Sequence, residues 1–183
     1  MRFDDFYKIL SKNGYFVFSC EDIGIFFPSV KKTTLMQCLS RWKKNGLLAS
    51  LKKGLYELVY PARRELPDMH IANKIYSPSY VSLETALSHY SVIPEVAMAV
   101  TSITPKTTRR FKNAHGLFIY RSVQPKAFCG YTIEKHGGCD VLIAEPEKAM
   151  ADLLYFKTLR GGKFDLGTPV SYTHLTLPTN REV

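Results

Sequence analysis

The sequence predicts an α+β protein that is built from two folded units. Three observations predict this class: helical patterns succeed one another over residues 1–46, a strand period follows over residues 47–60, and residues 80–159 alternate between helical stripes and strand-like runs. The chain of 183 residues is long enough for two small units with separate cores. Its hydrophobic content of 45% excludes a disordered chain.

The first two helices are predicted by apolar spacing and by capping residues. The first helix has apolar residues at i, i+3, i+4 and i+7, namely Phe3, Phe6, Tyr7 and Leu10, and it ends at Asn13-Gly14. A short apolar run follows at residues 15–18. Ser19 is then expected to cap a second helix, which Pro28 stops.

The third helix is expected to begin at the cap Ser29, to run to Asn45 and to be closed by Gly46. Its buried stripe is predicted to be Leu35, Cys38, Leu39 and Trp42. Residues 47–52 and 55–60 then form a hairpin around Lys53-Gly54. Three helices followed by such a hairpin make a winged helix-turn-helix, which is predicted for residues 1–60.

The charge of this unit points to a polyanionic partner. The net charge is +9, and seven Lys or Arg but no Asp or Glu lie between Ile23 and Tyr56. On the outer face of the third helix we expect Thr33, Gln37 and Ser40 to contact bases. Phosphate contacts are expected from Lys32, Arg41, Lys43, Lys44, Lys52 and Lys53. The alternative is that these lysines only keep a surface solvated.

A linker with a short helix is predicted for residues 61–79, and a second α+β unit for residues 80–169. Ser82 is expected to cap a helix that ends before Pro94, and Pro146 to open a last helix that runs to about Leu159. Strands are expected at residues 97–104, 108–112, 117–123, 128–135 and 141–144. They are predicted to form an antiparallel sheet with helices on one side.

The second unit also carries a second candidate basic patch, Lys106, Arg109, Arg110 and Lys112. It is expected to extend a DNA track, to meet an acidic protein surface, or to guard a sheet edge against pairing.

Enzymatic chemistry is not expected. Asp140, Glu145 and Lys148 resemble the scattered constellation of a restriction-type nuclease, but they lack its E-x-K spacing. His136 and Cys139 flank two glycines that indicate a hairpin turn rather than a nucleophile and its base. Neither metal-ligand spacing nor a phosphate-binding loop is present, so no metal and no cofactor are expected. No apolar run is long enough for a membrane span and no secretory signal is evident, which predicts a cytoplasmic protein.

A set of ordered sequence blocks resembles the AbiEi family of abortive-infection antitoxins. The blocks lie at residues 80–90, 93–95, 100–102, 118–121, 128–131 and 144–155, and the likeness extends over roughly residues 5–168. Ser91 stands where the family's pattern has glycine. The resemblance implies an antitoxin of a type IV toxin-antitoxin pair, which represses its own operon by binding promoter DNA and counters a nucleotidyltransferase-like toxin. The alternatives are a winged-helix regulator without a toxin, and a winged helix that binds protein.

The last residues, 170–183, resemble a translated sequencing-library adapter, so residues 80–169 are expected to be an incomplete, C-terminally truncated domain.

Overall fold

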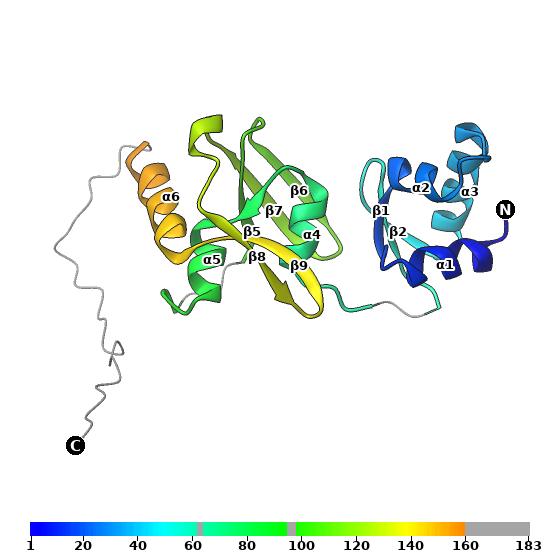
Figure 1. The fold of residues 1–183 in the computed structure, drawn as a ribbon, viewed down its shortest axis with the longest axis horizontal. Coiled ribbons are helices and arrows are strands. Elements are labelled where there is room, and N and C mark those ends of the chain that lie inside the picture. Colours follow the sequence, from blue (N-terminus) through cyan, green and yellow to red (C-terminus); the bar gives the residue numbers. More distant parts are fainter. Residues whose placement is uncertain (62–63, 95–97, 160–183) are drawn as a thin grey trace, which may run out of the picture.

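The computed structural model describes residues 1–61, 64–94 and 98–159. Over these residues the chain is an α+β protein with six α-helices, a three-stranded antiparallel sheet and a six-stranded mixed sheet. Figure 1 shows the two sheets in two units that lie side by side. The adapter-like residues 170–183 lie outside the described part of the chain.

The first unit follows the predicted order of elements. It consists of α1 (Phe3–Lys12), β1 (Val17–Ser19), α2 (Cys20–Phe26), α3 (Lys32–Lys44), β2 (Leu48–Lys52) and β3 (Leu55–Leu58). Ser19 caps α2 as predicted, because its hydroxyl accepts hydrogen bonds from the Glu21 and Asp22 backbone N–H groups. The Asp22 side chain accepts the Ser19 N–H in return, which completes a capping box.

The start of α3 differs from the prediction. Lys31 is its N-cap residue and makes no side-chain cap, so Ser29 does not cap this helix. The end is as predicted: Gly46 takes a φ of 72°, and its N–H bonds to the Lys43 carbonyl. The predicted stripe Leu35, Cys38, Leu39 and Trp42 is buried in a core shared with α1, β1 and the hairpin.

The sheet of the first unit has the strand order β1-β3-β2, with β2 and β3 joined at Lys53-Gly54. The pairing register shifts between Ser50 and Lys52, so Leu51 lies in a bulge. Leu48 and Leu58 pack into the core of the first unit, whereas Leu51 and Leu55 pack into the core of the second. The hairpin is therefore buried from both sides.

The second unit contains three α-helices and six strands in the described residues. They are α4 (Asp68–Ile75), β4 (Tyr80–Val81), α5 (Leu83–His89), β5 (Val100–Thr104), β6 (Arg109–Asn113), β7 (Gly116–Ser122), β8 (Tyr131–His136), β9 (Cys139–Ala144) and α6 (Pro146–Leu159), with a single 3-10 turn at Pro125–Ala127. The sheet order is β6-β7-β5-β4-β9-β8. The predicted antiparallel sheet is wrong, because β5 pairs with β7, and β4 with β9, in parallel.

Helices cover both faces of this sheet, so the expectation of helices on one side is also wrong. The Tyr120 hydroxyl donates to the Ala72 carbonyl of α4, and Tyr120 lies level with Ser102 and Val81 across the sheet. Tyr80 is the neighbour of Val81 and points to the opposite face, where its hydroxyl donates to Asp152 of α6. The order of layers is therefore α4, the sheet, and then α5 with α6.

Helix α4, which the sequence places in the linker region, contributes fully buried residues to the second core: Ile71, Ala72 and Ile75. Its Asn73 side chain donates to the Ser79 and Leu142 carbonyls and accepts the Leu142 N–H. Because β4 is only two residues long, this amide satisfies backbone groups of β9 that have no strand neighbour there. Among the described helices, none is long and apolar enough to cross a membrane.

Candidate nucleic-acid interface

The outward face of α3 gathers all the predicted contact residues of that helix in one exposed surface. These seven predicted residues, all of them exposed, are Lys32, Thr33, Gln37, Ser40, Arg41, Lys43 and Lys44. They are outward because Leu35, Cys38, Leu39 and Trp42, at the helical repeat, face the core. We call these seven residues the α3 face. It contains four cations and no carboxylate, and its last-turn bases lie at the negative end of the helix dipole.

The two predicted hairpin lysines differ in their surroundings. Lys53, at the turn, is exposed, but Lys52 is half-buried against the second unit, with its Nζ 5.9 Å from the centre of the Phe111 ring. Burial, and after it the charge of Lys106, hold the pKa of Lys52 below its usual value. Lys52 and Lys106 are therefore cations of different units that come close together.

The second candidate patch lies along an outer strand of the large sheet. Arg109, Arg110 and Lys112 are exposed on β6, which pairs with β7 on one side only. Lys106 precedes this strand, and its Nζ donates to the Ser77 carbonyl at 2.6 Å and lies 5.7 Å from the Tyr76 ring centre. We call Lys52, Lys53 and this second patch together the junction cluster.

The α3 face and the junction cluster are separate surfaces. In Figure 1 the β2–β3 turn lies on the side of the first unit that faces the second unit, while α3 lies on the far side. Sequence reasoning treated the helix and the hairpin as one surface. It could not anticipate the separation, because the contacts that hold the hairpin come from residues about 60 positions further along the chain.

The nuclease-like residues Asp140, Glu145 and Lys148 are not gathered in one place. The Lys148 Nζ donates to Asp152 Oδ1 at 2.7 Å, and Asp140 lies at the opposite end of β9 from Glu145. Within the described residues no group of three or more His, Cys, Asp or Glu side chains is suited to hold a metal ion. His136 and Cys139 flank a β8–β9 turn in which both glycines have positive φ, as the sequence predicts.

Sequence reasoning missed the most buried charged side chain of α6. Asp152 is 3% exposed, and its carboxylate accepts hydrogen bonds from the Ser82 hydroxyl at 2.8 Å and the Tyr80 hydroxyl at 3.1 Å, besides the Lys148 ion pair. The signal was present as an Asp inside an apolar helix, four residues after a lysine. Ser82 does occupy the N-cap position of α5, but its hydroxyl bonds to Asp152 and not to the helix.

A second missed cluster joins the end of α5 to β8. Glu134 accepts a hydrogen bond from the Tyr90 hydroxyl at 2.6 Å and lies 3.1 Å from His89 Nε2. The Tyr90 bond, opposed by burial and aided by the His89 contact, holds the pKa of Glu134 below its usual range. The contacts of Glu134 with His89 and Tyr90 hold β8 against the C-terminal end of α5.

No protein-family model matches the chain, and no curated protein matches it.

Proposed function

We propose that this protein is a DNA-binding transcriptional repressor whose first unit is a winged helix-turn-helix. The α3 face carries this proposal, because a helix with four cations, three small polar or amide side chains and no carboxylate outward suits the major groove. The element order of α1, α2 and α3 followed by the β2–β3 hairpin supports the winged-helix assignment.

Within the α3 face the roles divide by chemistry. Gln37 has an amide that offers a donor and an acceptor to one base edge, and Thr33 and Ser40 add hydroxyls on the same side of the helix. Lys32, Arg41, Lys43 and Lys44 neutralise phosphates, which contributes affinity but no sequence preference.

The junction cluster is proposed to contact phosphates beyond the major groove. The approach of Lys52 to Lys106 brings together two like charges, and a phosphate placed between them offsets their repulsion. This favours the DNA-track interpretation of the second patch over that of an edge guard alone.

The test is a titration of fluorescent duplexes with the full chain at several salt concentrations. We expect binding to the protein's own promoter region to weaken steeply with salt, because each phosphate contact releases counterions. Replacement of Lys43, Lys44, Lys52 and Lys53 by Ala removes four contacts, and each loss lowers the salt slope by about 0.9. Gln37→Ala is expected to reduce the preference for promoter over random DNA by about tenfold, the effect of one good base contact.

The matched control removes the same charge by replacing four exposed lysines elsewhere with Ala. They are Lys12, Lys74, Lys135 and Lys157. If this control lowers promoter affinity as much as the α3 and hairpin variant does, general basicity and not this surface is responsible. Unchanged affinity of the α3 and hairpin variant contradicts the proposed interface.

We further propose, on the resemblance to the AbiEi family, that the protein is an antitoxin that counters a nucleotidyltransferase-like toxin. The contacts of Asp152 support a common role for two of the blocks that carry the resemblance. Asp152, in the block at residues 144–155, accepts hydrogen bonds from Tyr80 and Ser82 of the block at residues 80–90. Lys148, in the same block as Asp152, pairs with the other carboxylate oxygen.

Expression of the neighbouring gene with and without this protein tests the antitoxin role. Growth arrest by a nucleotidyltransferase-like neighbour, relieved by co-expression of the wild-type chain, is expected. If a variant that does not bind DNA still relieves the growth arrest, neutralisation of the toxin is separate from repression of the operon. An unrelated or harmless neighbouring gene favours the alternative, a winged-helix regulator without a toxin.

A further inference from the structure

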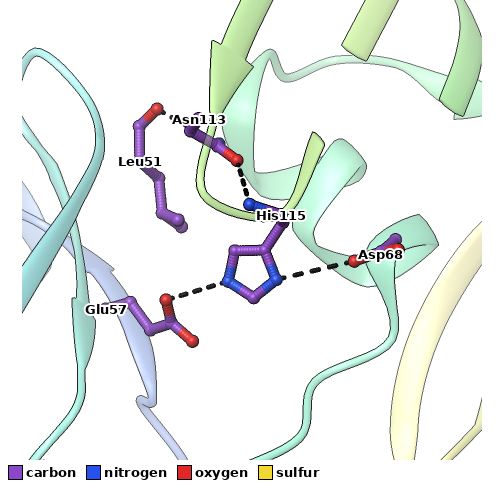
Figure 2. A network of polar contacts seen from close by, with 5 residues as sticks. All are labelled: Leu51, Glu57, Asp68, Asn113 and His115. Carbon is purple, nitrogen blue, oxygen red and sulfur yellow. Dashed lines mark hydrogen bonds and ion pairs between the residues drawn. The ribbon is translucent and has the colours of Figure 1, made fainter. Parts of the chain in front are cut away.

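A turn of the second unit is held against the hairpin of the first unit by polar contacts (Figure 2). The turn joins β6 to β7 at Asn113–Gly116 and carries His115. The imidazole Nε2 lies 2.9 Å from Glu57 Oε2 of β3, and Nδ1 lies 3.5 Å from Asp68 Oδ1 at the start of α4. One ring therefore links the hairpin of the first unit to the first helix of the second.

The position of Glu57 explains why this contact matters. Tyr56 and Leu58 of the same strand pack on the first core, so Glu57 and Leu55 point to the opposite side, toward the second unit. Glu57 is only 1% exposed and lies opposite Val17 in the β1–β3 pairing; Val17, like Leu55, belongs to the second core. A carboxylate buried in such surroundings needs partners, because its desolvation costs several kcal/mol.

The backbone of the hairpin is held by the same turn. The bulge at Leu51 takes this residue out of the β2–β3 ladder, and its carbonyl accepts a hydrogen bond from Asn113 Nδ2 at 3.3 Å. The Asn113 Oδ1 accepts the His115 N–H at 2.9 Å, which fixes the shape of the turn. Asn113 and His115 thus clamp β2 and β3 from one side.

We propose that the Asn113–Gly116 turn is a latch that fixes the orientation of the two units, so that the α3 face and the junction cluster, although separate, are presented to DNA in one fixed relative arrangement. The inference rests on the proposed DNA binding for its consequence, but not for the latch itself. A rigid pair of binding surfaces binds more tightly than the same surfaces on a loose tether, because less orientational freedom is lost on binding.

The variant His115→Ala tests the latch in the full chain, with His136→Ala, an exposed histidine at the end of β8, as control. The first measurement is trypsin cleavage after Arg64, which follows the first unit and whose guanidinium lies 4.7 Å from the Phe16 ring centre. We expect faster cleavage in His115→Ala than in wild type and in His136→Ala. His115→Gln retains an N–H donor for Glu57, so its cleavage rate is expected to lie between those of wild type and His115→Ala.

The second measurement is the DNA titration at several salt concentrations. His115→Ala is expected to bind DNA about tenfold more weakly, because its two units are less well oriented relative to each other. The salt slope is expected to stay unchanged, because the same cations contact the phosphates. Asn113→Ala, which removes the Leu51 contact, provides a second variant in case His115→Ala does not fold.

The outcomes are separable. Equal cleavage of wild type and of both latch variants overturns the latch, whatever the DNA result. Faster cleavage with unchanged DNA affinity overturns its role in DNA binding. Absence of DNA binding in the wild type overturns the proposed function, while the cleavage measurement still decides whether the latch exists.

Discussion

At the scale of single residues, the Asp152 carboxylate is the centre of the second unit's buried polar contacts. It joins Tyr80 and Ser82, on the central part of the sheet, to Lys148 on the covering helix. Burial, followed by the charge and the hydrogen bond of Asp152, holds the pKa of Tyr80 above its usual range, so this hydroxyl remains a donor. Three groups therefore depend on one carboxylate.

Asp152→Ala is expected to lower the free energy of unfolding by about 2 to 4 kcal/mol, because it leaves two buried hydroxyls and an amine without this acceptor. Urea denaturation followed by circular dichroism measures the change. Glu147→Ala, at an exposed position of the same helix, is the control and is expected to change stability by less than about 0.5 kcal/mol. Equal effects of the two substitutions contradict the role assigned to Asp152.

Ser91 has a left-handed backbone conformation, with a φ of 57°, directly after α5. This is the position at which the resemblance led us to expect glycine. Ser91→Gly is expected to raise stability by about 0.5 to 1 kcal/mol, because glycine adopts this conformation without the strain of a Cβ. Ser11→Gly, inside α1, is the control and is expected to destabilise. Thermal unfolding of both variants distinguishes conformational strain from a general effect of glycine.

His70 makes stability depend on pH. Burial lowers its pKa below the ordinary 6.5, although the hydrogen bond from its Nδ1 to the Asp140 carbonyl at 2.7 Å works the other way. The unfolded chain therefore takes up a proton at a higher pH than the folded chain. Stability is expected to fall as the pH drops below 6.5 toward the lower pKa of the folded state.

Urea denaturation between pH 5 and pH 8 measures this dependence. His70→Gln is expected to flatten it, and His136→Gln serves as the control. A pH dependence that is the same in wild type and His70→Gln assigns the effect to other groups.

At the scale of elements, the two serines that the sequence offers as helix caps have opposite outcomes. Ser19 caps α2 in a capping box, whereas Ser29 makes no cap for α3. We expect Ser19→Ala to lower stability by about 1 kcal/mol, and Ser29→Ala to change it by less than about 0.5 kcal/mol. Thermal unfolding of the two variants checks the assignment, since comparable losses are inconsistent with an uncapped α3.

The sequence was sufficient to locate most elements, because spacing and end signals are local. The buried stripe of α3 and the turns at Gly46 and Gly137-Gly138 are as predicted. The parallel pairing of β4 with β9 and of β5 with β7 was not accessible in this way. Alternation of side chains along a strand identifies its faces but carries no information about the direction of its neighbour.

The candidate interface was also only partly predictable. The exposure of Lys43, Lys44 and Gln37 follows from the helical repeat alone. The burial of Lys52 against Phe111 does not, since it depends on how the two units pack. The same holds for Glu57, which the strand pattern gives no reason to connect with His115.

At the scale of the whole molecule, the two units share apolar contacts and are expected to unfold together. Val17, Leu51 and Leu55 of the first unit belong to the core of the second. Trp42 is the single tryptophan of the chain and reports on the first core, whereas far-UV circular dichroism reports on both units. In urea we expect coincident transitions from the two signals.

Leu51→Ala combined with Leu55→Ala removes the shared contacts, and the transitions are then expected to separate. Ile133→Ala, at a residue that is 65% exposed, is the control and is expected to leave them coincident. Separate transitions in the wild type contradict cooperative packing of the two units.

The parallel pairing of β4 with β9 also has a consequence for biosynthesis. The residues of the first unit's own core have all been made once the chain has reached about residue 60. In contrast, β4 at residues 80–81 must wait for β9 at residues 139–144, and the hydroxyls of Tyr80 and Ser82 must wait for Asp152. A nascent chain therefore presents the first unit beside a strand that pairs with β5 but lacks its second partner, β9, for the time needed to translate about 60 codons. Vectorial folding from the N-terminus makes that interval the period in which the second unit is most open to misassembly or to capture by chaperones.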